Sequence, residues 1–221
     1  MPLPQKKEQI NRVTVKEHVY STLKDWIIDG TMQPEESIND NDIAQYFSVS
    51  RTPVREALLL LAEQDFVEVV PSKGTRVSPL NRDVAVEVYE ALSELNGSAA
   101  ALACKKHSDA QIAKLRSLNE AFAKALKDSN YKKLSMLDNS FHEYLFAIAA
   151  NSYLAEFAKE LTDHAARYRN LYFAKSKDQN ISVEEHNDII EAIATNNVEK
   201  AIKCAKQNWL GCFSIRVKKL F

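Results

Sequence analysis

The stretch from Ser50 to Arg55 has residue types and a spacing that suit contact with a nucleic acid. Arg51 and Arg55 are four residues apart, so a helix would place both side chains on one face. Ser50 and Thr52 add hydroxyl groups, and the unpaired N–H groups of a helix start can hold phosphate oxygens. The same arginine spacing also occurs on ordinary capped helices with solvated side chains. The surrounding elements must therefore decide between the two interpretations.

Asp138 and His142 form a second pair, again four residues apart, within a stretch of helical apolar spacing. They share one face with three apolar residues, Leu134, Phe141 and Leu145. Burying a carboxylate and an imidazole costs free energy unless the two groups are paired or bind a metal ion. The pair therefore predicts either an internal hydrogen-bonded network or two ligands of a metal site.

Two later polar residues are candidates to join this pair. His186 is predicted to open the penultimate helix, in the stretch VEEHNDIIEAI. Asn208 falls on the inward face of the last predicted helix, with Ala201, Ala205 and Cys212. Carboxylate and neutral imidazole suit zinc, nickel or a similar ion, whereas an amide oxygen is a weaker donor.

The elements around the arginine pair are predicted to form a helix-turn-helix. Apolar spacing indicates a first helix over 15–28. Residues 37–44 offer N-cap side chains and begin a short helix through Phe47. The turn 48–50 then leads to a helix over 51–64, and in this motif the second helix enters the major groove of DNA.

A small hairpin is predicted to follow the second helix of this motif. Residues 66–70 alternate and are rich in β-forming types, 71–74 form a turn, and 75–77 return. Such a wing reaches a neighbouring groove or the DNA backbone with the residues at its tip, Lys73, Gly74 and Thr75. The wing and the helix-turn-helix together favour DNA contact over a solvated arginine face.

The remainder of the chain is predicted to be an all-α bundle of about six helices. Their apolar stripes run over 84–102, 112–126, 134–148, 154–171, 186–193 and 198–213. The expected fold is therefore mainly α, with a winged helix-turn-helix before the bundle. We expect a flexible tail over 1–10, the DNA-binding domain over 11–80 and the helical domain over 81–221.

Composition agrees with a globular protein but gives no basic footprint. The chain is 45% hydrophobic and 27% charged, with a net charge of −1, and residues 11–80 hold 7 Lys+Arg against 11 Asp+Glu. Composition alone therefore argues against DNA binding, and only the local arrangement of residues can favour it.

No apolar run approaches the length of a membrane span and no secretory signal is visible, so the cytoplasm is expected. The three cysteines show no CxxC pair and are expected to be reduced and buried.

Residues 13–80 resemble the winged helix-turn-helix of the GntR family of bacterial transcription regulators. The resemblance rests on SVSRTPVREALLLL and FVEVVPSKGTRV. It implies DNA contact by Ser50, Arg51, Thr52, Arg55, Lys73 and Gly74. Asn41 departs from a frequent DNA-contacting arginine, and three residues replace frequent turn glycines: Glu35, Ser48 and Asp65.

Residues 81–221 resemble the FCD ligand-binding domain of the FadR subgroup of that family. The stretches DNSFHEYL, AANSYL and EEHNDIIEAIATNNVEKAI carry the resemblance. Members often bind a divalent metal through an Asp, a His four residues later, and two further histidines 22 residues apart. Asp138, His142 and His186 match this pattern, whereas Asn208 takes the last position. The resemblance thus implies a zinc or nickel site with a weakened fourth ligand.

The effector pocket is expected near the same helices. Many members carry an arginine where Leu92 stands and a glutamate where Asn96 stands, and the arginine often contacts an anionic ligand. Arg167, Arg169 and Tyr168 could compensate, although a solvated charged face would explain both arginines equally well. His164 is expected to point inward with Leu154, Phe157, Leu161 and Tyr168, as a substitute metal ligand or as an anchor for a bound acid.

These features predict a ligand-responsive regulator, usually a repressor in this family, that binds a double-stranded operator as a homodimer. Its effector would be a small molecule, such as a metabolite acid, and no membrane partner is expected. One alternative is a regulator whose pocket is vestigial and serves only dimerisation. A metal-dependent enzyme is the other, but the sequence shows no nucleophile and no paired acid/base carboxylates beyond Asp138, so no enzyme activity is expected.

Overall fold

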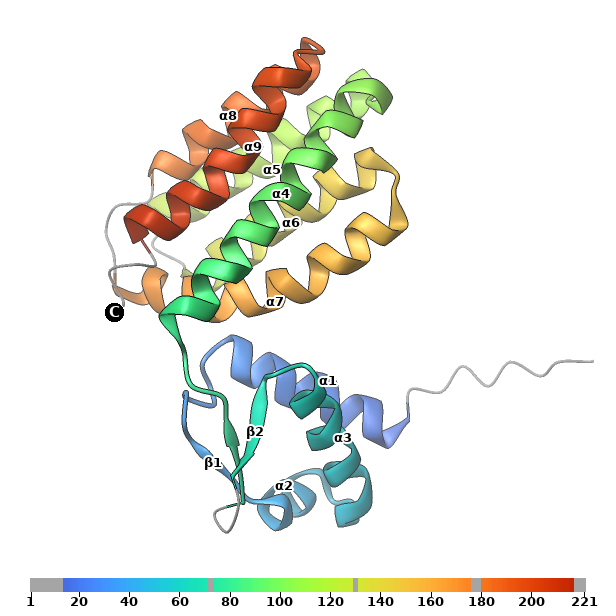
Figure 1. The fold of residues 1–221 in the computed structure, drawn as a ribbon, viewed down its shortest axis with the longest axis vertical. Helices are drawn as coiled ribbons and strands as arrows, with labels where there is room; N and C mark the ends of the chain where they lie inside the picture. The colour runs from blue at the N-terminus through green and yellow to red at the C-terminus, as the bar shows by residue number, and fades with distance from the viewer. Residues whose placement is uncertain (1–13, 71–73, 129–130, 176–179, 217–221) are drawn as a thin grey trace, which may run out of the picture. The chain divides into compact units, whose positions relative to one another are not determined.

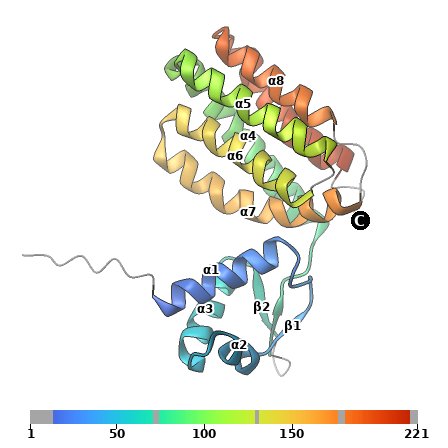
Figure 2. The ribbon, with the colours of Figure 1, turned by 180° about the vertical axis from the view of Figure 1, so that it is seen from behind.

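The computed structural model describes residues 14–70, 74–128, 131–175 and 180–216, which form two compact units (Figures 1 and 2). The first is a winged helix-turn-helix and the second is an all-α bundle, so the predicted fold class is confirmed. The expected tail over 1–10 lies outside the described residues. No helix in the described part of the chain combines the length and apolar character needed to cross a bilayer.

The first unit packs three helices against a three-stranded antiparallel sheet with the strand order β1-β3-β2. Its elements are α1 (Val15–Ile28), β1 (Ser37–Ile38), α2 (Asp40–Phe47), α3 (Arg51–Glu63), β2 (Val67–Val70) and β3 (Gly74–Val77). Strand β1 was not predicted: Ser37 pairs with Arg76 and Ile38 with Thr75. A two-residue strand is too short to show an alternating pattern, and its existence depends on the partner strand.

The cap of α2, the turn after it and the apolar face of α3 explain how α3 is oriented in this unit. Asn39 caps α2, because its side chain accepts a hydrogen bond from the backbone N–H of Asn41. Ser48 ends α2 with a left-handed backbone (φ 54°), which turns the chain into α3. The inner face of α3 buries Val54, Ala57, Leu58 and Leu61, spaced three and four residues apart. That packing leaves the arginines on the outer face.

The second unit consists of six α-helices and a short π-helix among the described residues. They are α4 (Arg82–Lys106), α5 (Asp109–Lys127), α6 (Tyr131–Ala149), α7 (Ser152–Lys175), α8 (Asn180–Ala194), α9 (Val198–Gly211) and η1 (Cys212–Arg216). Two predicted boundaries were wrong. Helix α8 begins well before His186, because its first turns lack a regular apolar stripe, and the last α-helix stops at Gly211 and continues as the π-helix.

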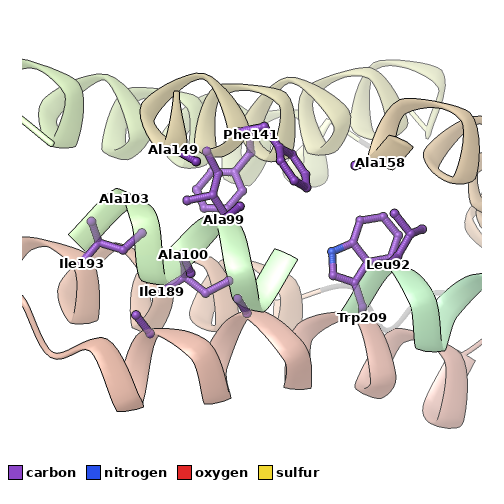
Figure 3. Close-up of a cluster of buried hydrophobic side chains, with 14 of the residues drawn as sticks. Leu92, Ala99, Ala100, Ala103, Phe141, Ala149, Ala158, Ile189, Ile193 and Trp209 are labelled. Atoms are coloured by element: carbon purple, nitrogen blue, oxygen red, sulfur yellow. The ribbon is translucent and has the colours of Figure 1, made fainter. Parts of the chain in front are cut away.

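Helix α4 lies at the centre of the bundle and contacts α6, α7, α8 and α9. Ala99, Ala100 and Ala103 give α4 a narrow face, so that neighbouring helices approach closely (Figure 3). Phe141 from α6 and Ile189 from α8 belong to the same buried cluster. This packing fixes the positions of α6 and α8, the helices that carry the predicted metal ligands.

Candidate DNA-binding face and candidate metal site

The start of α3 forms an exposed polar face. Arg51 and Arg55 have side chains that are 49% and 60% exposed, and Ser50 and Thr52 are exposed as well. Ser50 precedes the helix with an extended backbone but makes no side-chain cap, so its hydroxyl is not used within the helix start. The first N–H groups of α3 and this hydroxyl therefore provide donors suited to phosphate oxygens.

The wing lies beside this face. Gly74 and Thr75 border a groove of about 630 Å³ that Arg51 and Arg55 also line. Gly74 has a positive φ of 88°, which a side chain would strain. Lys73, the third predicted wing residue, lies outside the described residues. The structure thus brings together six of the seven predicted DNA-contacting residues.

Asp40, the first residue of α2, is a partner of the arginines that the sequence did not reveal. Its Oδ2 accepts hydrogen bonds from Arg51 Nη2 at 2.9 Å and from Arg55 Nε at 2.7 Å. These bonds, first that of Arg55 and then that of Arg51, lower the pKa of the Asp40 carboxyl below its ordinary value. The pairing depends on how α2 and α3 pack, and no regular spacing in the sequence signals it.

Asp138, His142 and His186 come together inside the bundle. One ligand atom from each lies within 4.8 Å of the others, and all three side chains are buried. Nε2 of His186 is 3.5 Å from Oδ1 of Asp138, and the His186 ring stacks on Phe141. The predicted grouping is therefore present in the structure, from helices α6 and α8.

Hydrogen bonds to two asparagines set the tautomers of both histidines. Nδ1 of His142 lies 3.0 Å from Oδ1 of Asn96, and Nδ1 of His186 lies 3.1 Å from Oδ1 of Asn119. The amide nitrogens of both asparagines donate to backbone carbonyls, Asn96 to that of Leu92 and Asn119 to that of Val183, which fixes the amide orientation. An amide oxygen only accepts, so each Nδ1 carries the proton and each Nε2 carries the lone pair.

This arrangement fits a cation. A lone pair on His186 Nε2 and a carboxylate oxygen of Asp138 face each other, and two acceptors this close favour a positive ion between them. Burial lowers the pKa of His142 to about 3, an effect larger than the opposing influence of Asp138, so its imidazole is neutral and able to ligate. The donor set of one carboxylate and two imidazoles suits zinc or nickel.

Arg169 modifies the site, and of the two interpretations of the α7 arginines the solvated charged face is excluded. Arg167 and Arg169 are both buried, because α7 turns this part of its surface into the bundle. Nη1 of Arg169 donates to Oδ2 of Asp138 at 2.7 Å, and Nη2 contacts Asn139. Arg169 therefore neutralises part of the Asp138 charge from inside the protein while leaving Oδ1 of Asp138 facing His186.

Asn208 on α9 lines a small cavity together with Asp138, His142 and Arg169. Its Nδ2 donates to Oε2 of Glu185 at 2.8 Å, so its amide oxygen is the group left to act as a ligand. The cavity is also lined by Trp209 and Cys212 and has a volume of about 10 Å³, room for about one water molecule. An organic effector can enter only if the helices around it move.

The other predicted effector residues do not border the small cavity. Leu92 is part of the apolar core, while Asn96 supports His142 as described above. The Tyr168 hydroxyl donates to the backbone carbonyl of Asn81, and neither Tyr168 nor Arg167 borders the small cavity. Burial lowers the Arg167 pKa and raises that of Tyr168.

His164 is partly buried and does not border this cavity either. Of its expected apolar neighbours, Tyr168 lies in the core and Leu154 and Leu161 pack against it, whereas Phe157 is 65% exposed, so the expectation was wrong for Phe157. The buried stripe of α7 runs instead through Ala158, Ala165 and Ala166, because small residues allow α7 to pack closely on its neighbours.

A larger cavity of about 330 Å³ lies between α6 and α7. Phe146 and Ala158 form its apolar wall, and Lys159 and Glu143 add charges. His142 borders this cavity as well as the small one, so it is the side chain that links the two spaces. No apolar spacing in the sequence predicted this second cavity.

Two stretches of the chain match known protein families. Residues 15–77 match the family described as "Bacterial regulatory proteins, gntR family" and residues 87–209 match the "FCD domain". The chain belongs to the GntR family. It is thus a DNA-binding transcription regulator rather than an enzyme.

Relatives of this GntR protein carry regulator names. The Nta operon transcriptional regulator of Aminobacter aminovorans is 30% identical over 73% of this chain and 75% of its own length. The HTH-type transcriptional repressor GlaR of Escherichia coli (strain K12) is 25% identical over 86% of this chain and 90% of its own. The solved structure of E. coli McbR/YncC has the same fold, with a TM-score of 0.81, 19% identity, and coverage of 95% of this chain and 99% of that one.

Proposed function

We propose that this GntR regulator represses transcription by binding a short inverted repeat as a homodimer. The observation that carries the proposal is the exposed start of α3, where Arg51 and Arg55 line a groove together with the wing residues Gly74 and Thr75. Two-fold operators match two-fold protein symmetry. Repression is supported by the name of the GlaR relative. A regulator that binds bacterial chromosomal DNA would act in the cytoplasm.

DNA selected from a random-sequence library by the full-length protein tests this proposal. We expect an inverted repeat, which Arg51→Ala and Arg55→Ala bind less selectively while remaining folded. Sedimentation at micromolar concentration should give a dimer. A monomer that binds the selected DNA fully, or two alanine variants with unchanged affinity and salt dependence, would contradict the proposal.

We further propose that the bundle binds a small-molecule effector, with a zinc or nickel ion held by Asp138, His142 and His186. The lone pairs on both Nε2 atoms and the facing carboxylate oxygen support this assignment. A bound ion would supply coordination positions for the oxygen atoms of a small acid. Asn96 and Asn119 would hold the two imidazoles in their ligating orientation. The amide oxygen of Asn208 would be a weak fourth ligand.

Metal analysis of protein purified without chelator tests the site. Zinc or nickel should be retained, lost in His142→Ala and His186→Ala, and bound more tightly by Asn208→His, whose ring could keep Glu185 as a hydrogen-bond partner. If the wild type binds neither zinc nor nickel when they are added, the Asp–His group is a structural network.

A metal-free pocket is the second candidate, and Arg169 is the observation that favours it. The guanidinium already supplies one positive charge to Asp138. In that case the site would recognise an effector by hydrogen bonds alone, or the bundle would serve only dimerisation. Melting measurements with organic acids, with and without chelator, separate these outcomes from the metal site.

A further inference from the structure

Asp40 and the two arginines of α3 form a three-residue cluster on the DNA-binding face. One carboxylate oxygen, Oδ2, accepts from Nε of Arg51 at 3.3 Å, from Nη2 of Arg51 at 2.9 Å and from Nε of Arg55 at 2.7 Å. The arginine side chains are half or more exposed, whereas that of Asp40 is 21% exposed. The acid therefore lies under the arginines and contacts both at a single atom.

The bonds to Asp40 use the inner edges of both guanidinium groups. A guanidinium has an edge that contains Nε and an outer edge formed by Nη1 and Nη2. Within the described residues, neither terminal nitrogen of Arg55 nor Nη1 of Arg51 makes a hydrogen bond. The outer edge can bind O6 and N7 of guanine with two parallel hydrogen bonds.

The position of Asp40 is itself well fixed. It opens α2, directly after the N-cap Asn39, whose side chain binds the backbone of Asn41. Ile38, on the other side, is buried and pairs with Thr75 of β3. The carboxylate is thus held by a helix start and by a strand, so it can serve as a fixed point for two long side chains.

We propose that Asp40 is a positioning residue for DNA recognition, which holds Arg51 and Arg55 so that both outer edges read guanine at a fixed spacing. This inference rests on the proposed operator contact by α3. Ordering two arginines before binding lowers the entropy that must be lost on the DNA. The carboxylate also reduces repulsion between the two guanidinium groups, which would otherwise move them apart.

The test is selection from a random-sequence DNA library with full-length wild type, Asp40→Asn, Asp40→Glu and the two arginine-to-alanine variants. Arg51→Ala and Arg55→Ala should each lose guanine at a different position of the half-site. A well-placed arginine–guanine contact gives a preference of roughly 5- to 150-fold. We expect Asp40→Asn to reduce the preference about fivefold or more at both positions together, and Asp40→Glu to retain most of it.

Asp42→Asn is the matched control. Asp42 lies in the same first turn of α2 and its removal changes the charge near DNA equally, but Asp42 does not contact the arginines. Both Asn variants should therefore gain similar affinity for random DNA, while only Asp40→Asn loses guanine preference. Circular dichroism melting confirms folding, and Asp40→Ser, which also suits a helix start, replaces Asp40→Asn if that variant is unstable.

Two outcomes separate the inference from the proposed function. If Asp40→Asn keeps the full guanine preference at both positions while the alanine variants lose theirs, Asp40 does not position the arginines and the inference is wrong. If instead the alanine variants keep the wild-type preference, the assignment of α3 as the recognition helix fails. A sharper preference in Asp40→Asn would show that the acid opposes DNA binding, which also overturns the inference.

Discussion

Asp138 has two possible sources of positive charge, the buried Arg169 and a bound ion. Removing Arg169 breaks the buried ion pair of Asp138, and breaking such a pair typically costs about 3–5 kcal/mol. We therefore expect Arg169→Met to lower the free energy of unfolding strongly in chelator, and zinc to restore more stability to it than to the wild type. Urea unfolding with and without zinc measures both effects.

Arg116→Met is the control for that prediction. Arg116 pairs with Glu191 on the surface, where both side chains are about half exposed, so its loss should cost about 0–1 kcal/mol. Zinc should have the same effect on this variant as on the wild type. An Arg169→Met protein that is as stable as the Arg116→Met protein would show that Asp138 needs no cation.

His142 should give the metal-free protein a pH-dependent stability. Burial lowers its pKa from 6.5 to about 3, so below pH 6.5 the unfolded chain binds a proton here that the folded chain does not. The free energy of unfolding should then fall as the pH drops from about 6.5 towards 3, by up to about 1.4 kcal/mol per pH unit. Urea unfolding in chelator between pH 7 and 5.5 should show this slope reduced in His142→Gln. A His142→Gln protein with the same slope as the wild type would contradict this prediction.

At the level of elements, the turns of the winged helix-turn-helix carry strain. Glu35, Ser48 and Asp65 all have positive φ, between 54° and 68°, at the positions where the resemblance leads one to expect glycine. A left-handed backbone costs a non-glycine residue roughly 1–2 kcal/mol. We expect Ser48→Gly to raise the free energy of unfolding by up to about 1 kcal/mol, since the more flexible unfolded chain offsets part of the gain. Ser21→Gly, the same change inside α1, should lower it by about 0.5–1 kcal/mol.

The sequence predicted the helices and the wing because their apolar spacing and caps are local. It also predicted that Asp138 and His142 share a face, which needs only helical periodicity. It did not reveal β1, the Asp40 contacts or the burial of Arg169, because each depends on a partner distant in sequence. The prediction for Phe157 failed for a related reason: Ala158, Ala165 and Ala166 set the inward face of α7, and small residues give a weak signal in a hydrophobic pattern.

For the whole molecule, the small cavity should control how fast ligands arrive. An organic acid can enter the small cavity only when the helices around it separate, so its observed binding rate should level off at the opening rate as its concentration rises. Trp209 lines the cavity and should report binding by fluorescence in stopped-flow measurements. Trp26→Phe removes the other tryptophan and isolates this signal. A rate that grows in proportion to the concentration of the acid, without a plateau, would contradict this prediction.

A cavity that is too small for its effector at rest has a consequence for timing. If only a fraction of the molecules is open at any moment, the apparent dissociation constant is the intrinsic one divided by that fraction. Loading is then slow, and a ligand enclosed after closure also leaves slowly. We expect such a regulator to respond to the effector concentration averaged over time and not to brief fluctuations in that concentration.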